Sequence, residues 1–278
     1  MESKQDLTVI IVTFNSEDKI FECIESIPSD IDIYVVENSD DKNLKSVLES
    51  KYSNVKCILT GSNRGYAAAN NIGLRLVKTN YALVLNPDTK IKENTIVNFF
   101  NFSKIKKDFW LVGPSNNQSQ KISEDENNIY EVENLKGFAI FFNITKFNQD
   151  FFDENFFLYF EEIDLCKKVK KKGGSIYLDK NITIYHEGAA SVKKIEKIEL
   201  EKSRNWHWMW SSFYYHKKYK GFLVALILIS PKLIPAIFKL IFYLITFDQE
   251  KREIYFFRLS GIINSILGKK SWYRPSID

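Results

Sequence analysis

Tyr81-Ala82-Leu83-Val84-Leu85-Asn86-Pro87-Asp88, residues 81–88, is the stretch that decides the fold. Its apolar part, 81–85, is typical of a strand that is buried on both faces of a sheet. Pro87 has no N–H group, so the strand must end before it. Asp88 therefore lies just past the carboxyl end of a strand, where open α/β sheets bind ligands. A carboxylate there can hold a divalent cation that in turn holds a diphosphate, although Asn-Pro-Asp is also ordinary turn chemistry.

Strands and helices alternate three times before this stretch. Apolar, β-branched segments predict strands at 7–13, 31–36 and 55–59. The segments between them predict helices at 17–27, 43–51 and 66–78. Short connections between alternating strands and helices indicate a parallel sheet with right-handed crossovers.

Polar side chains follow the predicted strands. These residues are Thr13, Asn15, Glu37, Asn38, Asn63, Asn86 and Asp88. The carboxyl ends of parallel strands meet at one edge of a sheet, so the set predicts a ligand cleft there, although any single member could be an ordinary loop residue. The loops contain neither a Gly-x-Gly-x-x-Gly motif nor a Walker lysine, so a metal ion is the natural counter-charge for a diphosphate.

The second half of the chain adds acidic residues and a histidine. We expect strands at 110–113 and 136–143, a polar loop at 116–128, and a hairpin-like pair of strands at 175–179 and 181–185. Glu161-Glu162-Ile163-Asp164 begins a helix that ends near Lys172, and the helix dipole favours the ionised form of acids in a first turn. Such a carboxylate could act as a general base, or it could simply favour the helix start. His186 follows a strand and could complete a metal site, although a lone histidine is more often structural.

Composition excludes several classes of protein. With 278 residues, 45% of them hydrophobic and 15% aromatic, the chain can bury a large core. Its net charge of +4, without alternating arginines and aromatic residues, gives no indication of nucleic-acid binding. The three widely spaced cysteines form neither a disulfide framework nor a zinc pattern, which favours a reducing compartment. The polar start of the chain leads directly into a strand, so we expect no signal peptide and a cytoplasmic location.

The C-terminal region, 216–278, has a different character. Segment 222–247 is almost wholly apolar and is long enough to span a bilayer, but it contains Lys232, Lys239 and two prolines. Basic residues flank it on both sides, which is consistent with both flanks remaining cytoplasmic. We expect two short helices, bent at the prolines, that lie in the membrane interface. The alternatives are a helical hairpin packed on the catalytic domain or on a second subunit, which would make a homodimer, and a true membrane span.

A set of motifs occurs in a characteristic order. They are IVTFNS at 11–16, VVENS at 35–39, NRGYAAANNIG at 63–73, LNPD at 85–88, FDENFFLYFEEIDL at 152–165, and His186. Over about residues 7–215 the chain thereby resembles glycosyltransferase family 2, in its rhamnosyltransferase-like branch. The resemblance implies the GT-A fold, an α/β fold with a Rossmann-like, mostly parallel sheet wound by helices. The implied domain is 1–215, with a donor half at about 1–115 and an acceptor, catalytic half at about 116–215, followed by an apolar helical appendage at 216–278.

The resemblance also implies roles for individual residues. Thr13, Asn15, Glu37 and Asn38 would belong to the nucleotide-sugar site, and Asn63, Asn70 and Asn86 would lie near the ribose, phosphates or sugar. Asp88 and His186 would be ligands of Mn²⁺ or Mg²⁺. Glu162 would be the catalytic base, Glu161 would orient the acceptor, and Arg204 would meet the diphosphate. Glu37 and Glu162 depart from the usual pattern, because the family commonly has aspartate at both positions.

These implications define the expected function. We expect a metal-dependent, inverting glycosyltransferase that uses a dTDP- or UDP-sugar donor and a saccharide or lipid-linked saccharide acceptor in cell-surface polysaccharide synthesis. It would be peripheral on the inner face of the cell membrane. A nucleotidylyltransferase would need a glycine-rich, basic loop after the first strand, which 13–15 is not. A catalytically weak domain used for membrane docking or assembly is the other alternative, and intact Asp88, Glu162 and His186 argue against it.

Overall fold

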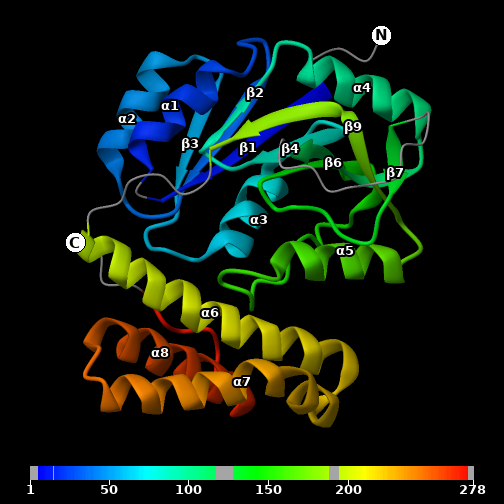
Figure 1. Cartoon of the computed structure of the whole chain (residues 1–278). Helices are drawn as coiled ribbons and strands as arrows, with labels where there is room; N and C mark the ends of the chain where they lie inside the picture. Colours follow the sequence, from blue (N-terminus) through cyan, green and yellow to red (C-terminus); the bar gives the residue numbers. More distant parts are fainter. Residues whose placement is uncertain (1–5, 15, 117–127, 188–193, 275–278) are drawn as a thin grey trace. The chain divides into compact units, whose positions relative to one another are not determined.

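The computed structural model describes residues 6–14, 16–116, 128–187 and 194–274 (Figure 1). The chain divides into two compact units. The first comprises Met1–Phe152 and Glu162–Ala189, and the second comprises Asp153–Glu161 and Ala190–Asp278. The domain limit predicted at residue 215 falls inside one long helix, Lys194–Lys220.

The first unit is built on a mixed sheet. Its strands within the described residues are β1 (Leu7–Thr13), β2 (Asp32–Glu37), β3 (Val55–Leu59), β4 (Tyr81–Leu85), β5 (Thr89–Ile91), β6 (Phe109–Asn116), β7 (Ile129–Glu131), β8 (Ala139–Asn143) and β9 (Ser175–His186). The strand order is β3-β2-β1-β4-β8-β6-β9-β5, and β7 pairs with β9. Strands β1 to β4 are parallel, as the alternating sequence predicts, whereas β8 runs antiparallel to β4 and β6.

Helices cover both faces of this sheet (Figure 1). They are α1 (Glu17–Glu25), α2 (Lys42–Lys51), α3 (Tyr66–Leu76), α4 (Thr95–Ile105) and α5 (Glu161–Lys171). One buried cluster joins α1, α2 and α4 to one face, and a second joins α3 and α5 to the other. Strand β1 alternates between the two clusters, with Val9 and Ile11 in the first and Ile10 in the second, as a strand buried on both faces must. The fold is therefore a three-layer α/β fold around a continuous apolar sheet.

The second strand-rich half differs from the prediction. The predicted hairpin at 175–185 is wrong, because β9 is one strand that pairs with β6 along its length. The register jumps from Pro114↔Asp179 to Ser115↔Thr183, so the intervening polar residues form an irregularity instead of a reversal. The Asp179 carboxylate accepts a hydrogen bond from the Asn181 N–H, which stabilises this local bend. Strands β5 and β7 and helix α4 were not predicted.

The second unit contains the helices α6 (Lys194–Lys220), α7 (Phe222–Ile245) and α8 (Gln249–Ile266). A core of Met209, Phe213, Ala225, Ile229 and Ile262 joins all three. The exposed fraction of each of these side chains is zero, so the three helices form one packed layer with its own core.

Helix α7 is one continuous helix, so the predicted pair of short bent helices is wrong. Pro231 has no N–H to donate to the carbonyl of Ile227, one turn earlier. The Ser230 hydroxyl donates to that carbonyl instead, at 2.8 Å, and keeps the backbone oxygen satisfied. The helix can therefore pass through the proline without ending.

Candidate active site

The turn after β4 brings two predicted metal ligands together. The Thr89 N–H donates to the Asn86 carbonyl, closing a turn with Pro87 at its second position. Strand β5 then pairs with β9 so that Thr89 lies opposite His186. The His186 Nε2 atom lies 3.3 Å from the Asp88 Oδ2 atom, and both side chains are 25% exposed. The carboxylate and the imidazole therefore meet at a solvent-accessible position at the end of the β4 strand.

Predicted donor-site residues hold buried polar atoms without hydrogen-bond partners among the described residues. These atoms are Thr13 Oγ1, Glu37 Oε2, Asn70 Oδ1 and Asn86 Oδ1. Thr13 and Glu37 are register partners at the carboxyl ends of β1 and β2, so their side chains are neighbours in the sheet. Buried polar atoms are rarely left unpaired in folded proteins, and an exception marks a place where a ligand can bind.

The Glu37 carboxylate illustrates this environment. The side chain is 2% exposed, and its Oε1 atom accepts a 2.5 Å hydrogen bond from the Ser39 hydroxyl. Burial raises the pKa of Glu37, while the Ser39 hydrogen bond opposes that change. A carboxyl with one occupied and one unoccupied oxygen is suited to recognise an N–H group of a ligand.

Asn38 hydrogen-bonds to Asn63 of the loop between β3 and α3. The Asn38 Nδ2 group donates to Asn63 Oδ1 at 3.0 Å, and Asn38 Oδ1 accepts from the Arg64 N–H at 2.9 Å. Asn63 Oδ1 also accepts from the Gly65 N–H, so it fixes the turn that begins α3. Gly65 has a φ of +85°, a conformation that favours glycine. The structure thus shows these two asparagines shaping the loop between β3 and α3, and their contact with a donor remains a prediction.

Two consecutive residues that the sequence interpretation missed lie beside Glu162 and His186, respectively. A Cβ atom at Gly137 would lie 3.7 Å from the Glu162 Cβ and Cγ atoms, so the absence of a side chain there opens space beside Glu162. The next residue, Phe138, stacks on the His186 ring with centroids 4.9 Å apart. Gly137 and Phe138 therefore connect the predicted base with the predicted metal ligands.

Tyr66 fixes this connection from the opposite side. Its hydroxyl donates a 2.6 Å hydrogen bond to the Gly137 carbonyl. Tyr66 is the first residue of α3, so the turn that Asn63 shapes and the segment beside Glu162 are held together. Sequence reasoning could not find this contact, because 71 residues separate its two partners and neither lies in a charged motif.

Burial decides the ionisation of Glu162. It raises the pKa of the Glu162 carboxyl, whereas hydrogen bonds from the backbone N–H groups of Glu162 and Ile163 and the charge of Lys136 lower it. The helix start acts in the expected direction, but desolvation is the larger effect. A raised pKa suits a general base, which needs a basicity close to the working pH.

The backbone just before Glu161 is strained. Tyr159 and Phe160 have φ values of +67° and +71°, which are rare for aromatic residues. Both rings contact Trp208, with centroids 5.4 and 5.3 Å apart, and this packing within the second unit holds the conformation. Strained residues of this kind cluster at functional sites.

The remaining predicted residues are placed as follows. Glu161 is 6% exposed at the start of α5. Arg204 lies in α6 of the second unit, where its Nη1 group is 3.0 Å from Glu201 Oε1. Asn15 lies outside the described residues. The predicted roles of all three remain predictions.

The chemistry of Asp88 and His186 fits a divalent cation. Among the described residues there is no group of three or more histidine, cysteine, aspartate or glutamate side chains that could hold a metal alone. Mg²⁺ in phosphate-transfer sites is commonly held by one or two carboxylates, substrate phosphates and water. One carboxylate with one imidazole leaves positions for diphosphate oxygens, so the pair fits a cation that binds together with a donor.

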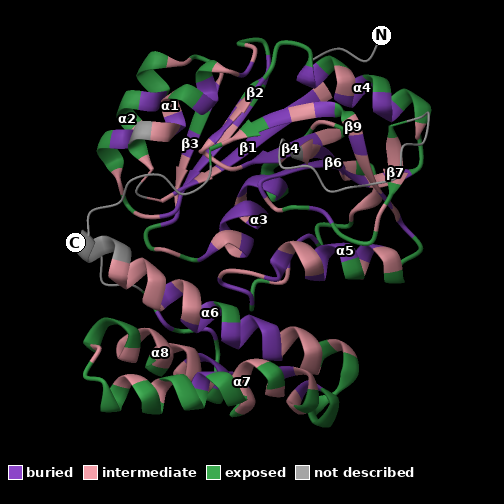
Figure 2. Cartoon of the chain, viewed as in Figure 1, coloured by how far each residue is buried: buried purple, intermediate pink, exposed green. Residues whose placement is uncertain are grey.

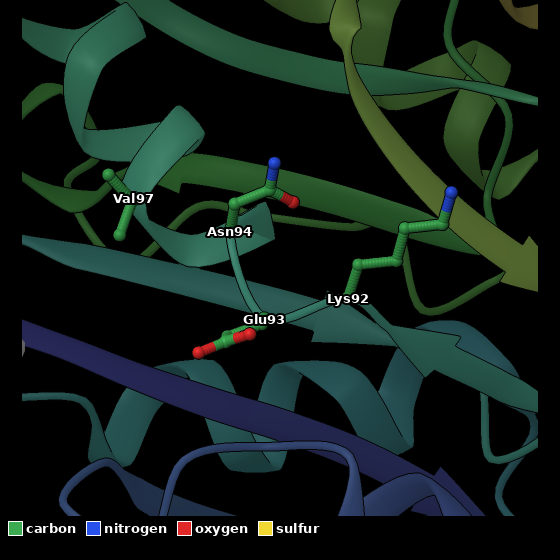
Figure 3. A pocket seen from close by; sticks show the side chains of 4 residues that line it. All are labelled: Lys92, Glu93, Asn94 and Val97. Carbon is green, nitrogen blue, oxygen red and sulfur yellow. The ribbon is translucent and has the colours of Figure 1, made fainter.

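A separate hollow of about 610 Å³ lies where β5 leads into α4 (Figure 3). It is lined by Lys92, Glu93, Asn94 and Val97. None of these is a predicted site residue, and the hollow lies past β5 from Asp88. Its lining offers no carboxylate–imidazole pair, so we place the candidate site at Asp88, His186 and Glu162 instead.

Comparison with known proteins decides the family. The model of glycosyl transferase family 2 matches residues 8–164, more than half of the chain, including the β4 turn and the start of α5. The chain belongs to glycosyl transferase family 2. The matched region therefore contains Asp88, Glu162 and the predicted donor-site residues with unpaired buried oxygens, whereas His186 and the Ala190–Asp278 part of the second unit lie beyond it.

Two relatives of this family 2 chain act in glycan synthesis, according to their names. The low-salt glycan biosynthesis hexosyltransferase Agl10 of Haloferax volcanii is 25% identical over 198 residues, which is 62% of this chain and 64% of the relative. The poly(ribitol-phosphate) beta-glucosyltransferase of Bacillus spizizenii is 31% identical over 108 residues, 35% of this chain and 17% of the relative. The chain thus spans less than two thirds of the length of either relative.

Solved structures confirm the GT-A fold. Staphylococcus aureus TarS 1–349 in complex with UDP-GlcNAc has a TM-score of 0.53 at 16% identity, covering 96% of this chain and 93% of TarS 1–349. GalNAc-T7 with UDP, GalNAc and Mn²⁺ has a TM-score of 0.57 at 13% identity, covering 74% of this chain and 52% of that one. At these identities the likeness concerns the fold alone.

Proposed function

We propose that this family 2 chain is a metal-dependent, inverting glycosyltransferase that moves a sugar from a nucleotide-diphosphate donor to a lipid-linked saccharide. The observation that carries the proposal is the connection of Glu162 with the Asp88–His186 pair through Gly137 and Phe138. It supports a role for Glu162, whose pKa is raised by burial, as the base that acts next to a diphosphate-bound cation on the carboxylate–imidazole pair. The names of the two relatives, a hexosyltransferase and a glucosyltransferase of glycan synthesis, support the same class of reaction.

The donor would bind across the carboxyl ends of β1, β2 and β4. The unsatisfied oxygens of Thr13, Glu37 and Asn70 would accept hydrogen bonds from the nucleoside and ribose, and the Thr13 hydroxyl could also donate one. A uracil or thymine base has an N–H group that could donate a hydrogen bond to Glu37 Oε2. This supports a UDP- or dTDP-sugar as the donor. Membership of the rhamnosyltransferase-like branch is proposed from the sequence motifs alone and does not name the donor sugar.

Transfer would be a single in-line displacement. The Glu162 carboxylate takes the proton of the acceptor hydroxyl as that oxygen bonds to the anomeric carbon, and the bond from this carbon to the diphosphate oxygen breaks. Asp88 and His186 would hold Mn²⁺ or Mg²⁺, which supplies positive charge to the departing diphosphate. Phe138 keeps the His186 ring in place, and Gly137 leaves room for the acceptor beside Glu162.

The exposed apolar surface of the helical unit supports the proposal that the acceptor is bound to a membrane. By length and composition α7 could cross a membrane, and only 17% of its most apolar window is buried. Figure 2 shows α7 largely exposed. Of its two lysines, Lys232 donates to Ser212 of α6, whereas Lys239 is exposed, with its amine 5.4 Å from the Tyr255 ring centroid of α8. The exposed surface of α7 therefore carries one lysine among apolar side chains.

The packing of α7 against α8 favours a position of α7 in the membrane interface over a membrane-spanning position. Helix α8 packs along α7 and carries Lys251, Arg252 and Glu253 in its first turns. A membrane-spanning α7 would bring these charges towards the bilayer, which is costly. We infer that α7 lies in the interface with its apolar face in the lipid, on the inner face of the cell membrane.

Diphosphate release from a panel of nucleotide sugars tests the proposal. We expect the purified full-length chain to release UDP or dTDP slowly from one donor in Mn²⁺ or Mg²⁺, and faster when a lipid-linked saccharide is present. Asp88→Asn should weaken donor and metal affinity together, and Asn94→Asp, in the hollow beside α4, is a control outside the site. Undiminished release in excess chelator would contradict the metal requirement, and no release from any donor would favour a docking module.

A further inference from the structure

Aromatic side chains gather directly before helix α5, which carries the predicted base. Tyr159 and Phe160 are the last two residues before this helix. Both rings contact Trp208 of α6, with centroids 5.4 and 5.3 Å apart, and the Phe160 ring also contacts that of Tyr215 of α6 at 5.6 Å. All four residues belong to the second unit. We call them the aromatic platform.

The backbone holds the platform together in a strained conformation. Tyr159 and Phe160 have φ values of +67° and +71°, which are rare for aromatic residues. The Ser211 hydroxyl of α6 donates a 2.9 Å hydrogen bond to the Leu158 carbonyl and so anchors the segment immediately before them. This conformation places both rings against Trp208 at a cost in backbone energy, as occurs where function needs a fixed geometry.

Trp208 is the exposed part of the platform. Its side chain is 39% exposed, although two rings contact it and the Lys232 ammonium lies 5.2 Å from its ring centroid. The indole N–H groups of Trp206 and Trp210 donate to α8 and to the segment after it. Among the described residues, neither the Trp208 N–H group nor the Tyr159 hydroxyl has a hydrogen-bond partner. The platform therefore offers solvent an aromatic surface with two unused polar groups.

These groups match the chemistry of a sugar ring. The C–H bonds on the face of a pyranose are weakly positive and pack on the negative face of an aromatic ring. The hydroxyl groups on its rim accept hydrogen bonds from an indole N–H and exchange them with a tyrosine hydroxyl. Binding sites for small molecules commonly combine an aromatic lining with a few polar groups that fix orientation. A lipid tail would use neither polar group.

We propose that the aromatic platform binds the sugar ring of the saccharide acceptor, with that ring on Trp208. The base acts on a hydroxyl of the acceptor, and the two residues of backbone from Phe160 to Glu162 span at most about 7 Å. The donor contacts, in contrast, are expected at the strand ends of the first unit. The inference deepens the proposed function, on which the identity of this sugar as the acceptor rests.

Saturation-transfer NMR tests the site without turnover or lipid. Aromatic protons of the full-length chain are irradiated, and transfer to the ring C–H protons of the methyl glycosides of glucose, galactose, mannose and rhamnose is measured. Sorbitol, an open-chain polyol, is the reference. Titrations are made alone and with UDP or dTDP and Mg²⁺, so that binding of the acceptor after the nucleotide is also detected. We expect millimolar binding of at least one glycoside, and Trp208→Ala should weaken it about tenfold.

Matched variants separate the aromatic face from exposure and from folding. Trp272→Ala removes another exposed tryptophan of the same unit, whose ring contacts Trp206 and Tyr273 instead, and should keep glycoside binding. Trp208→Phe retains an aromatic face and should bind within about threefold of the unchanged chain. Trp208→Leu retains apolar volume without an aromatic face and should weaken binding as alanine does. It replaces Trp208→Ala if that variant fails to melt cooperatively.

Each outcome decides the proposal. No glycoside signal above that of sorbitol overturns it, and so does binding that survives Trp208→Ala or Trp208→Leu. Displacement of the glycoside by a nucleotide sugar, but not by UDP or dTDP, would assign the platform to the donor sugar and overturn the acceptor assignment.

Two further measurements distinguish a lipid surface and a failure of the proposed function. Weaker flotation of Trp208→Ala with phosphatidylcholine vesicles, with unchanged glycoside binding, would assign Trp208 to the membrane surface and overturn the proposal. Absence of diphosphate release from every nucleotide sugar, with glycoside binding that depends on Trp208, would contradict the proposed function alone, because this binding needs no turnover.

Discussion

The proposed function assigns the role of catalytic base to Glu162. Replacing its carboxylate by the neutral amide of Glu162→Gln should cut turnover by roughly 10²–10⁴-fold, because a general base contributes about that factor. Donor affinity should remain nearly unchanged, since the expected donor contacts are made by Thr13, Glu37 and Asp88. Single-turnover kinetics and calorimetric donor titration measure the two quantities separately.

Glu161→Gln is the matched control for this change. Glu161 is the preceding residue of the same helix and has the same side chain. A larger loss of turnover in Glu161→Gln than in Glu162→Gln would show that the base lies one residue earlier. Equal losses with weakened donor binding would indicate a structural role for both.

The charge of Lys136 partly opposes the effect of burial on the pKa of Glu162. Burial raises the pKa of Glu162 and the Lys136 charge lowers it, so Lys136→Gln should raise it further. A base must be ionised, and activity is lost as pH falls through its pKa, so the acid limb of kcat/KM should move to higher pH. Lys167→Gln, an exposed lysine of α5, removes the same charge and should leave the limb in place. An unmoved limb in Lys136→Gln would mean that another group controls it.

Individual site residues differ in how far the sequence could predict them. The proximity of Asp88 and His186 was predictable, because each comes at the end of an apolar strand and strand ends share one edge of a sheet. Gly137, Phe138 and Tyr66 were not, since their contacts join irregular segments far apart in the sequence. The raised pKa of Glu162 was not predictable, because the helix dipole can be inferred from sequence but the extent of burial cannot.

Some strands and helices could likewise be predicted from the sequence, and others could not. Strands β1 and β3 were predicted with their observed limits, because apolar runs bounded by turns leave little freedom. The bend in β9 was interpreted as a reversal, since Asp179, Lys180 and Asn181 form the same local signal in a bulge as in a hairpin. Helix α7 was interrupted in the prediction at Pro231, but the Ser230 hydroxyl compensates for the missing N–H group.

The crossing of α6 and α8 depends on one glycine. A Cβ atom at Gly261 would lie 2.2 Å from the Trp206 carbonyl oxygen, a backbone atom that cannot move aside. Gly261→Ala should therefore separate the helices and destabilise this unit by about 1–3 kcal/mol. Urea unfolding followed by tryptophan fluorescence measures it, and Ile263→Ala, at an exposed position of α8, should stay within about 0.5 kcal/mol of the unchanged chain. An equally stable Gly261→Ala would show that the two helices are not in close contact.

At the scale of the whole molecule, the tail cannot be studied by removing it. Truncation after Lys220 would leave α6 without α7 and α8, exposing Met209 and Phe213, which are fully buried in their shared core. Such a truncated chain would aggregate because its core is incomplete, whether or not the intact chain binds a membrane. Full-length chains with changes on the outer face of α7 are the proper comparison, because that face packs against nothing in this unit.

Membrane association is therefore best tested with Phe238→Glu, which places a charge on the outer face where the side chain is 67% exposed. Interfacial binding predicts that this variant keeps its melting temperature but binds anionic vesicles at least tenfold more weakly, since a carboxylate must enter apolar lipid. Binding of the unchanged chain should weaken with salt without vanishing, because each basic residue near an anionic surface adds about 1 kcal/mol while apolar burial does not depend on screening. A spanning helix would resist both high salt and alkaline extraction. A subunit interface would instead appear in sedimentation as a dimer that Phe238→Glu converts to a monomer, with vesicle binding unchanged, so flotation and sedimentation on the same two proteins distinguish the three arrangements.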